Sequence, residues 1–373
     1  MKIGVDVRVL EWRRGGVARI VINILKIWQR GGGKHHFVLY FQNHIPDDDF
    51  LRHPNFELKL LKGPKLLRIH RIVAEQFLMP SQLKKDNLDL FFATGYSAPL
   101  LLRSVKIVVA AWDISYSTHP EHYSWRHRIS LDYFSRKSCG CAAGVITAST
   151  FDAKQIEKYY KVRPQNISTV YLAADKKFTA KRNKSEINRI TVKYKLPSKF
   201  ILSMGVIQNR RNIDVIINAF KQLKNEYNDF SFVLVGRNYT QPYINIEGMM
   251  KEMIEEKYAL YIPWIEDEDL PALYQAAHSY ICTSTVDGEA LMLKEAMQSG
   301  TPVITSPLLK DAIGGNGLII DDPTNILNTS KILRIAMSDD LLRNKLIKDG
   351  KKWTQNITWE RVADKILTFL ESR

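Results

Sequence analysis

Residues 200–236, FILSMGVIQNRRNIDVIINAFKQLKNEYNDFSFVLVG, contain an alternation of apolar and amphipathic segments that indicates the fold class. The apolar run at 200–206 predicts a buried strand, the polar residues at 207–211 a loop, and 212–227 an amphipathic helix. A second apolar strand is predicted at 231–236. Apolar strands joined through helices are typical of parallel sheets in α/β proteins. We therefore predict a Rossmann-like domain that begins near residue 200.

The N-terminal part of the chain repeats this order of elements. KIGVDVRV at 2–9 predicts a strand, EWRRGG at 11–16 a turn, and VARIVINILKIWQR at 17–30 an amphipathic helix. Further strands are predicted at HFVLYF (36–41), LDLFFA (88–93), KIVVAA (106–111) and AGVITA (143–148). The chain is longer than the roughly 250 to 300 residues that one core serves, so we predict an α/β protein with two Rossmann-like, doubly wound domains.

A lysine-rich polar stretch at 176–198 separates the two series of elements and suits an exposed linker region. We therefore assign residues 1–175 to an N-terminal domain and 176–357 to a C-terminal domain, and we treat 358–373 as a final helix. No short repeat or low-complexity tract interrupts either series.

The distribution of charge indicates which partners the protein attracts. Residues 1–180 hold 28 Lys and Arg against 15 Asp and Glu, whereas the remainder holds 26 against 24, so most of the net charge of +15 lies in the first half. A basic surface of this kind attracts nucleic acid, an anionic membrane or a phosphorylated acceptor.

The cysteine content favours a location in the cytoplasm. Three cysteines make no disulfide framework, and Cys139 and Cys141 lack further zinc ligands nearby. Without an apolar run of about 18 residues, membrane contact is expected to be peripheral.

In each predicted domain, the loop after the first strand carries candidate phosphate ligands. Gly15 and Gly16 lie where backbone can approach a phosphate at a helix N-terminus, although a tight turn with positive φ is the stronger interpretation of a lone glycine pair. Arg210 and Arg211 follow the strand at 200–206. Two guanidinium forks match diphosphate oxygens and offset the charge of a leaving group without a metal; a solvated loop pair is the alternative.

The segment STVDGEALMLKEAMQSGTPVITSP at 284–307 is the most specific in the chain. Asp287 precedes a helix whose first amides, near Gly288 and Ala290, form an anion-friendly pole. The Asp287 carboxylate can accept hydrogen bonds from sugar hydroxyls, and Glu295, two turns further on, from vicinal ribose hydroxyls. The alternatives are that Asp287 caps the helix and that Glu295 is a solvated helix residue.

The run DGEALMLKEAMQSGTPV resembles the Glu-Gly-Phe-Gly-Leu-Pro-x-x-Glu-Ala-Met-Ala-x-Gly-x-Pro-Val signature of glycosyltransferase family 4. Asp287 and Glu295 then match the two glutamates of the family's Glu-x7-Glu motif. Three more segments resemble its diphosphate loop, its nucleobase-side strand and helix, and the exit from its first domain, namely GVIQNRRN (205–212), YIPWIEDEDLPALYQAA (261–277) and ASTFDAKQIEKYYKVRPQNISTVYLAADKKF (148–178). The ordered set is more specific than any one motif.

The resemblance implies a GT-B fold, in which two Rossmann-like domains face an interdomain cleft. The donor would bind the C-terminal domain and the acceptor the N-terminal one, and the helix at 358–373 would cross back onto the first domain. Family members are generally retaining and metal-independent. An oxygen of the donor's own phosphate accepts the acceptor proton, so no dedicated protein base is required.

The same resemblance assigns roles to individual residues. Arg210 and Arg211 would hold the diphosphate, Glu295 the ribose, Asp287 the transferred sugar, and Ile265 the base edge. The remaining donor-binding positions that it implies are Gly15, Gly16, Gly205, Gly288, Glu289, Ala290 and Leu291. No cofactor or metal is expected, because the GDP- or UDP-linked sugar is a substrate.

WDISYSTHPEHYS and YLAAD are closest to mannosyl- and related transferases of surface polysaccharide assembly, which suggests GDP-mannose and a glycan or lipid-diphosphate-linked acceptor. Asp287 stands where the family often has Glu, and Trp112 where it has His, so Trp112 would form an apolar wall for a deoxy sugar. A non-catalytic nucleotide- or glycan-binding relative is therefore an alternative, as is another GT-B enzyme such as a nucleotide-sugar epimerase. Nucleic-acid binding rests on charge alone and is not expected.

The segment LKGPKLLRIHRIVAEQFLMP at 61–80 places Lys62, Lys65, Arg68 and Arg71 among apolar residues at near-helical spacing. A helix of this kind can lie on an anionic membrane surface, which would suit a lipid-diphosphate acceptor. A core-facing helix with a solvated side is the alternative.

Overall fold

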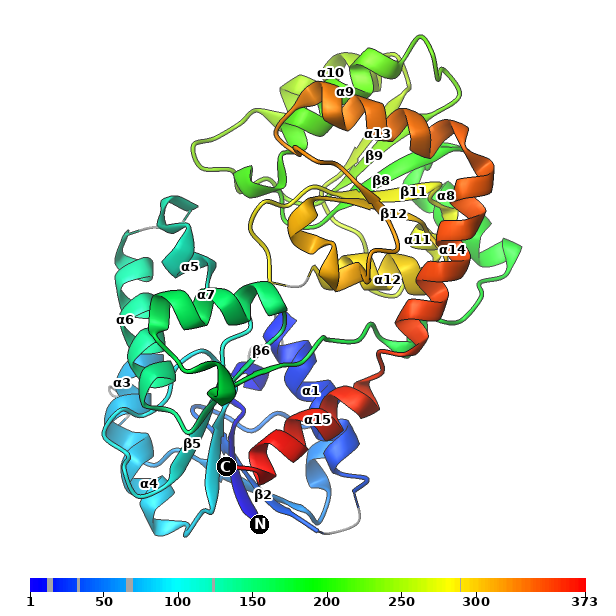
Figure 1. Ribbon diagram of the computed structural model, residues 1–373. Coiled ribbons are helices and arrows are strands. Elements are labelled where there is room, and N and C mark those ends of the chain that lie inside the picture. The colour runs from blue at the N-terminus through cyan, green and yellow to red at the C-terminus, as the bar shows by residue number, and fades with distance from the viewer. Residues whose placement is uncertain (12–15, 32–33, 65–69, 123–124, 289) are drawn as a thin grey trace. The chain divides into compact units, whose positions relative to one another are not determined.

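The computed structural model describes residues 1–373 except 12–15, 32–33, 65–69, 123–124 and 289. The chain divides into two compact units: Met1–Leu172 with Trp359–Arg373 form unit 1, and Ala173–Thr358 form unit 2. Each unit is an α/β domain built on one parallel sheet, so the predicted pair of Rossmann-like domains is confirmed (Figure 1).

Unit 1 contains a seven-stranded sheet of order β3-β2-β1-β4-β5-β6-β7. Its strands are β1 (Lys2–Asp6), β2 (His36–Phe41), β3 (Phe56–Leu60), β4 (Leu90–Ala93), β5 (Lys106–Ala110), β6 (Gly144–Thr147) and β7 (Ile167–Thr169). Its helices are α1 (Gly16–Trp28), α3 (Arg71–Val73), the π-helical segment η3 (Ala74–Leu78), α4 (Met79–Lys85), α5 (Ser115–Thr118), α6 (Trp125–Cys141), α7 (Thr150–Tyr160) and α15 (Trp359–Glu371). The order reverses direction beside β1, as in doubly wound sheets.

Unit 2 contains a six-stranded sheet of order β10-β9-β8-β11-β12-β13. Its strands are β8 (Phe200–Met204), β9 (Ser231–Val235), β10 (Ala259–Ile262), β11 (Ser279–Cys282), β12 (Val303–Thr305) and β13 (Leu318–Ile319). Its helices are α8 (Lys184–Tyr194), α9 (Ile213–Leu223), α10 (Ile246–Glu255), α11 (Leu270–Ala276), α12 (Leu291–Ser299), α13 (Ile326–Ser338) and α14 (Asp340–Gln355). The strand order again reverses, here between β8 and β11.

The strand predicted at 200–206 and the helix predicted at 212–227 both form. All of β8 is buried, because helices cover both faces of a parallel sheet. Helix α9 buries an apolar stripe that ends at Leu223. The helix stops there rather than at Tyr227, because residues 224–229 supply no further side chain to the core except the partly buried Tyr227.

The last helix, α15, belongs to unit 1 and packs against α1 (Figure 1). Its apolar side is buried, and the indole Nε1 of Trp28 on α1 donates a hydrogen bond to the carbonyl of Ala363 at 3.2 Å. Lys34 forms an ion pair with Glu371 at 2.8 Å. Residues from the two ends of the sequence thus share one core.

The segment at 61–80 is not one continuous helix. Lys62 precedes a bend, Lys65 and Arg68 lie outside the described residues, and helix begins at Arg71. The guanidinium of Arg71 donates to the carbonyl of Gly95 at 2.7 Å, so this charge is engaged within the unit. Within the described ranges, no helix has the length and apolar character needed to cross a bilayer.

Candidate functional site

Two loops of unit 2 meet at one edge of its sheet. β8 and β11 are parallel neighbours, with Ile201 opposite Ser279, so their carboxyl ends lie side by side. The loop after β8 carries Arg210 and Arg211 in a short turn, and the loop after β11 carries Asp287. Open α/β sheets bind ligands outside the carboxyl ends of their strands, at a point where the strand order reverses.

The structure brings the predicted arginines and Asp287 together. Oδ2 of Asp287 lies 3.5 Å from Nη1 of Arg210 and 3.9 Å from Nη2 of Arg211. The loops are also joined through backbone, since the amide of Thr285 donates to the carbonyl of Arg210 at 2.8 Å and the hydroxyl of Thr283 to that of Arg211 at 2.7 Å. One carboxylate therefore serves two guanidinium groups that local hydrogen bonds hold in place.

Arg211 is buried beneath this edge. Its Nη1 donates to the carbonyl of Met204 at 3.0 Å, and a Cβ on Gly205 would lie 2.3 Å from the same nitrogen. Gly205 also has a φ of +124°, so the position suits glycine twice over. Burial alone would lower the pKa of Arg211, but the fields of Cys282 and Asp287 raise it above its usual value. The buried guanidinium stays charged.

Arg210 is the more exposed of the two. Its Nε donates to Oε1 of Gln208 at 2.8 Å and its Nη1 donates to the carbonyl of Val286. Only 15% of its side chain is exposed, so the alternative of a solvated arginine pair is wrong. Asn212 is the N-cap residue of α9, but its side chain caps no amide of the helix. Its side-chain amide donates instead to the carbonyl of Thr283 at 2.9 Å.

Helix α12 starts just beyond Asp287 and has no side-chain cap. Its N-cap residue is Ala290, whose φ of +43° is left-handed, and Leu291 is its first residue. The alternative that Asp287 caps the helix is therefore wrong. Gly288 is buried in the connecting bend, and the predicted Glu289 lies outside the described residues. The uncapped first amides of α12 keep their capacity to bind an anion.

Glu295 lies inside unit 2, not on a solvated helix face. Only 2% of the residue is exposed, and Oε2 accepts a hydrogen bond from the hydroxyl of Tyr274 at 3.2 Å. Burial and the Glu295 carboxylate raise the pKa of Tyr274 well above its usual value, which keeps this hydroxyl a donor. The hydrogen bond from Tyr274 thus holds one oxygen of this carboxylate inside the unit.

The loop that carries Ile265 is anchored by a buried acid. The Ile265 side chain belongs to the core, so this residue can offer a nucleobase only its backbone. Asp269, four residues further on, is 0% exposed and accepts hydrogen bonds from Lys193 Nζ at 2.8 Å and from Tyr194 Oη at 2.7 Å. Arg189 donates to its other oxygen. Helix α8 thus fixes the loop.

This anchor predicts acid sensitivity. Burial alone would raise the pKa of Asp269, but its three hydrogen-bond partners lower it from 3.8 to about 2. A lowered pKa contributes stability that is fully present above about pH 4 and is lost as the pH falls toward 2. We expect Asp269→Asn to cost about 1 to 2 kcal/mol at pH 7 and little at pH 2. Urea unfolding of both proteins across this range measures the difference; a gap that does not shrink would contradict the assignment.

In unit 1, the glycine turn is only partly described. Gly15 lies outside the described residues, and Gly16 is the first residue of α1. A Cβ at Gly16 would meet no described atom within 4 Å. Trp112 does not form an exposed wall: it is 4% exposed and its Nε1 donates to the carbonyl of Thr94 at 3.0 Å. The expected apolar surface for a deoxy sugar is therefore wrong.

A buried ionic cluster at the carboxyl end of β1 was not predicted. Nη2 of Arg8 lies 2.8 Å from Oδ2 of Asp6 and 2.6 Å from Oε2 of Glu75, and all three residues are buried. Burial alone would raise the pKa of Asp6, but Arg8 holds it below its usual value. The signal in the sequence was a pair of opposite charges, Asp6 and Arg8, at the end of an apolar strand.

Both units match models of known protein families. Residues 14–178 match the model described as Glycosyltransferase Family 4, and residues 184–353 match the model described as Glycosyl transferases group 1. The chain is a glycosyltransferase. The two matched stretches follow each other as the two units do, and together they include every predicted site residue.

Individual proteins similar to this glycosyltransferase agree with the family match. It is 26% identical to O-antigen chain mannosyltransferase B of Escherichia coli over 69% of this chain and 68% of that protein. It is 23% identical to the serotype-specific mannosyltransferase WbdA of Escherichia coli over 60% of this chain, but it spans only 28% of that longer protein.

Solved structures similar to this glycosyltransferase establish the GT-B fold. Anabaena HepE in complex with UDP and glucose superposes with a TM-score of 0.74 over all of both chains at 17% identity. WaaG, a glycosyltransferase involved in lipopolysaccharide biosynthesis, has a TM-score of 0.73 at 16% identity over 99% of both chains. At these identities the likeness shows the fold alone.

Proposed function

We propose that this glycosyltransferase moves a hexose, with mannose from GDP-mannose as the first candidate, onto a glycan or lipid-diphosphate-linked acceptor in surface polysaccharide synthesis. The names of the relatives support mannose, since two of them are O-antigen or serotype-specific mannosyltransferases. The HepE complex with UDP and glucose makes UDP-linked sugars the alternative donors. The reaction breaks the bond between the sugar C1 and the β-phosphate oxygen and forms a bond to an acceptor hydroxyl.

The observation that carries this proposal is the convergence of Arg210 and Arg211 on Asp287. The distances of 3.5 and 3.9 Å are longer than good ionic hydrogen bonds, so the arginines keep donors for a diphosphate. As the leaving nucleoside diphosphate gains charge, the two guanidinium groups stabilise it. Asp287 then accepts hydrogen bonds from hydroxyls of the transferred sugar.

The other predicted residues complete the donor site in this proposal. Glu295 binds the ribose, the backbone at Ile265 binds the base edge, and the amides at the start of α12 face the sugar and phosphate.

We extend the proposal to a retaining, metal-independent mechanism without a cofactor. Two arginines supply the positive charge that a divalent cation provides in other transferases. The acceptor hydroxyl attacks the face that the leaving group vacates, and a phosphate oxygen of the donor takes its proton, so the anomeric configuration is retained.

Two exposed apolar residues on hydrogen-bonded segments support peripheral contact between unit 1 and an anionic membrane. Phe77 and Leu101 are 68% and 69% exposed, and Gln76 joins their segments by hydrogen bonds to the carbonyl of Ala98 at 3.0 Å and the amide of Leu100 at 2.9 Å. The surrounding unit carries most of the net positive charge. Such a surface suits a lipid-linked acceptor. Cosedimentation with anionic but not with neutral vesicles checks this contact.

Incubation with GDP-mannose, and in parallel with UDP-glucose, tests the proposed function. We expect transfer to a mannose-terminated acceptor, an α-linked product by NMR, and slow donor hydrolysis when the acceptor is absent. Excess EDTA should leave the rate within about twofold, because the arginines carry the electrostatic stabilisation. Complete loss that Mg²⁺ or Mn²⁺ restores would reject the metal-independent mechanism. Neither transfer nor hydrolysis with any nucleotide sugar would favour a non-catalytic binding protein.

A further inference from the structure

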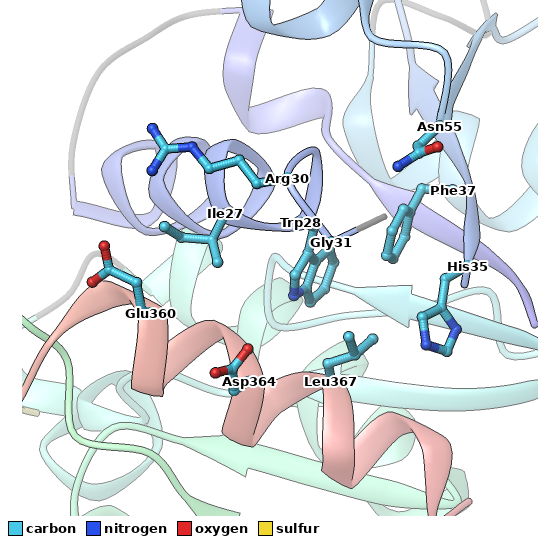
Figure 2. Close-up of a pocket in the computed structure, with 10 residues that line it drawn as sticks. All are labelled: Ile27, Trp28, Arg30, Gly31, His35, Phe37, Asn55, Glu360, Asp364 and Leu367. Atoms are coloured by element: carbon cyan, nitrogen blue, oxygen red, sulfur yellow. The ribbon is translucent and has the colours of Figure 1, made fainter. Parts of the chain in front are cut away.

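A cavity of about 270 Å³ opens in unit 1 between the end of α1, the start of β2 and α15 (Figure 2). His35 and Asn55, which line it, stand immediately before or at the amino ends of β2 and β3. All strands of this sheet are parallel, so the cavity lies at the edge opposite to their carboxyl ends. It is therefore separate from the edge at which sheets of this class bind their substrates.

The lining combines an apolar base with polar groups of both kinds. The rings of Trp28 and Phe37 stack with centroids 4.8 Å apart beneath the cavity. Glu360 and Asp364, one helical turn apart, rise from α15 toward α1 (Figure 2). Arg30 lies two residues beyond the end of α1. The lining thus offers carboxylate acceptors, a guanidinium donor and an apolar surface around one small space.

His35 is the second, independent feature of the cavity. It is 9% exposed, and neither of its ring nitrogens has a hydrogen-bond partner among the described residues. Nε2 lies 3.0 Å from Oε1 of Glu371, but without the alignment of a hydrogen bond. Burial and the positive N-terminus lower the pKa of His35 despite the opposing effect of Glu371, which favours the neutral ring with one donor and one acceptor. Nδ1 has no partner among the described residues, so a ligand hydroxyl that pairs with it would satisfy a buried nitrogen.

We propose that this cavity binds one neutral hexose ring of the glycan substrate, as a holding site separate from the reaction. Carboxylates, an amide and a neutral imidazole pair with sugar hydroxyls, while the apolar base suits the C–H face of a ring. The volume of about 270 Å³ is below the roughly 300 Å³ at which pockets for drug-sized ligands begin, so it fits a sugar rather than a nucleotide. Two carboxylates against one arginine disfavour a phosphate.

The role of the site rests on the proposed function, because that function makes a glycan the acceptor. When the cavity holds one sugar of the acceptor glycan, the reacting end of that glycan no longer has to bind from solution. Its effective concentration at the reaction site therefore rises. A long acceptor should then have a lower KM than a short one. The advantage should disappear when the cavity is disabled, with kcat unchanged.

Binding of methyl α-D-mannopyranoside to the full chain, followed by saturation-transfer NMR, tests this proposal without any turnover. Asp364→Asn removes the charge of an exposed side chain and should weaken binding about tenfold, as expected for loss of a charged hydrogen bond. Lys365→Gln, on an exposed neighbour of the same helix that does not line the cavity, should leave binding unchanged. Asn55→Ala provides a second weakening variant.

The outcomes also separate this site from the donor site. Binding that persists in Arg210→Ala, whether or not the protein transfers sugar, supports the cavity independently of the proposed function. Non-saturable binding, equal binding by Asp364→Asn and the unchanged protein, or competition by glycerol at equal concentration would overturn the proposal.

Discussion

Arg210→Ala should lower kcat by about 30- to 900-fold, because a lost electrostatic contact to developing charge costs roughly 2 to 4 kcal/mol in the barrier. The Arg210 guanidinium donates hydrogen bonds to Gln208 and to the carbonyl of Val286. When the guanidinium is removed, both oxygens can accept hydrogen bonds from water instead. The melting temperature should therefore change little. Steady-state kinetics with saturating donor and acceptor measure the first effect, and thermal unfolding measures the second.

Two matched variants make this test specific. Arg334→Ala removes an exposed arginine of the same unit, whose pair with Glu226 is a surface ion pair worth about 0 to 1 kcal/mol, and should keep full turnover. Arg211→Lys keeps a charge beside Asp287 but loses the fork that binds Met204, so it should lose part of the activity. Arg211→Ala is a poorer test, because it also empties a buried space. Normal kcat in both Arg210→Ala and Arg211→Lys would contradict the diphosphate role.

The sequence was sufficient for the elements around this site because each has one clear period. The apolar run that became β8 and the apolar stripe that became α9 are both buried as the pattern requires. Their order along the chain, strand then loop then helix, places Arg210 and Arg211 at the carboxyl edge of a parallel sheet without further information.

Local rules failed at the two helix starts beside the site. Asn212 and Ala290 both have left-handed backbone, with φ of +48° and +43°, and neither caps its helix with a side chain. Non-glycine residues in this region cost of order 1 to 3 kcal/mol and gather at functional sites. The loop that carries Arg210 and the loop that carries Thr285 form hydrogen bonds to each other instead. These residues are about 75 positions apart in sequence, and capping rules consider only local contacts.

The burial of Glu295 and the Arg8 cluster were hidden for a similar reason. A glutamate on a helix is usually solvated, and only the packing of α11 against α12 encloses Glu295 with Tyr274. Glu75 reaches Arg8 across 67 residues of sequence. Sequence patterns indicate which residues face a core, but not which charged residues from distant segments come together in the folded chain.

Gly236→Ala should destabilise the protein by about 2 to 5 kcal/mol, which combines left-handed backbone strain with overpacking. Gly236 has a φ of +143°, and its added Cβ would lie 1.9 Å from the carbonyl oxygen of Gly205. That atom belongs to backbone and cannot rotate away. Since Gly205 lies against the guanidinium of Arg211, any shift that relieves the clash disturbs the donor site as well.

The same substitution at Gly350 serves as the control. Gly350 lies within α14 of the same unit, and its nearest neighbour would be Cε of Met297 at 3.4 Å, an ordinary contact. Gly350→Ala should leave stability unchanged or raise it by up to about 1 kcal/mol, because alanine favours helix. Urea unfolding of both variants measures the contrast, and donor binding measures its consequence at Arg211. If Gly236→Ala unfolds at the same denaturant concentration as Gly350→Ala, the close approach of β8 and β9 does not fix this edge, and the proposed position of Arg211 loses its support.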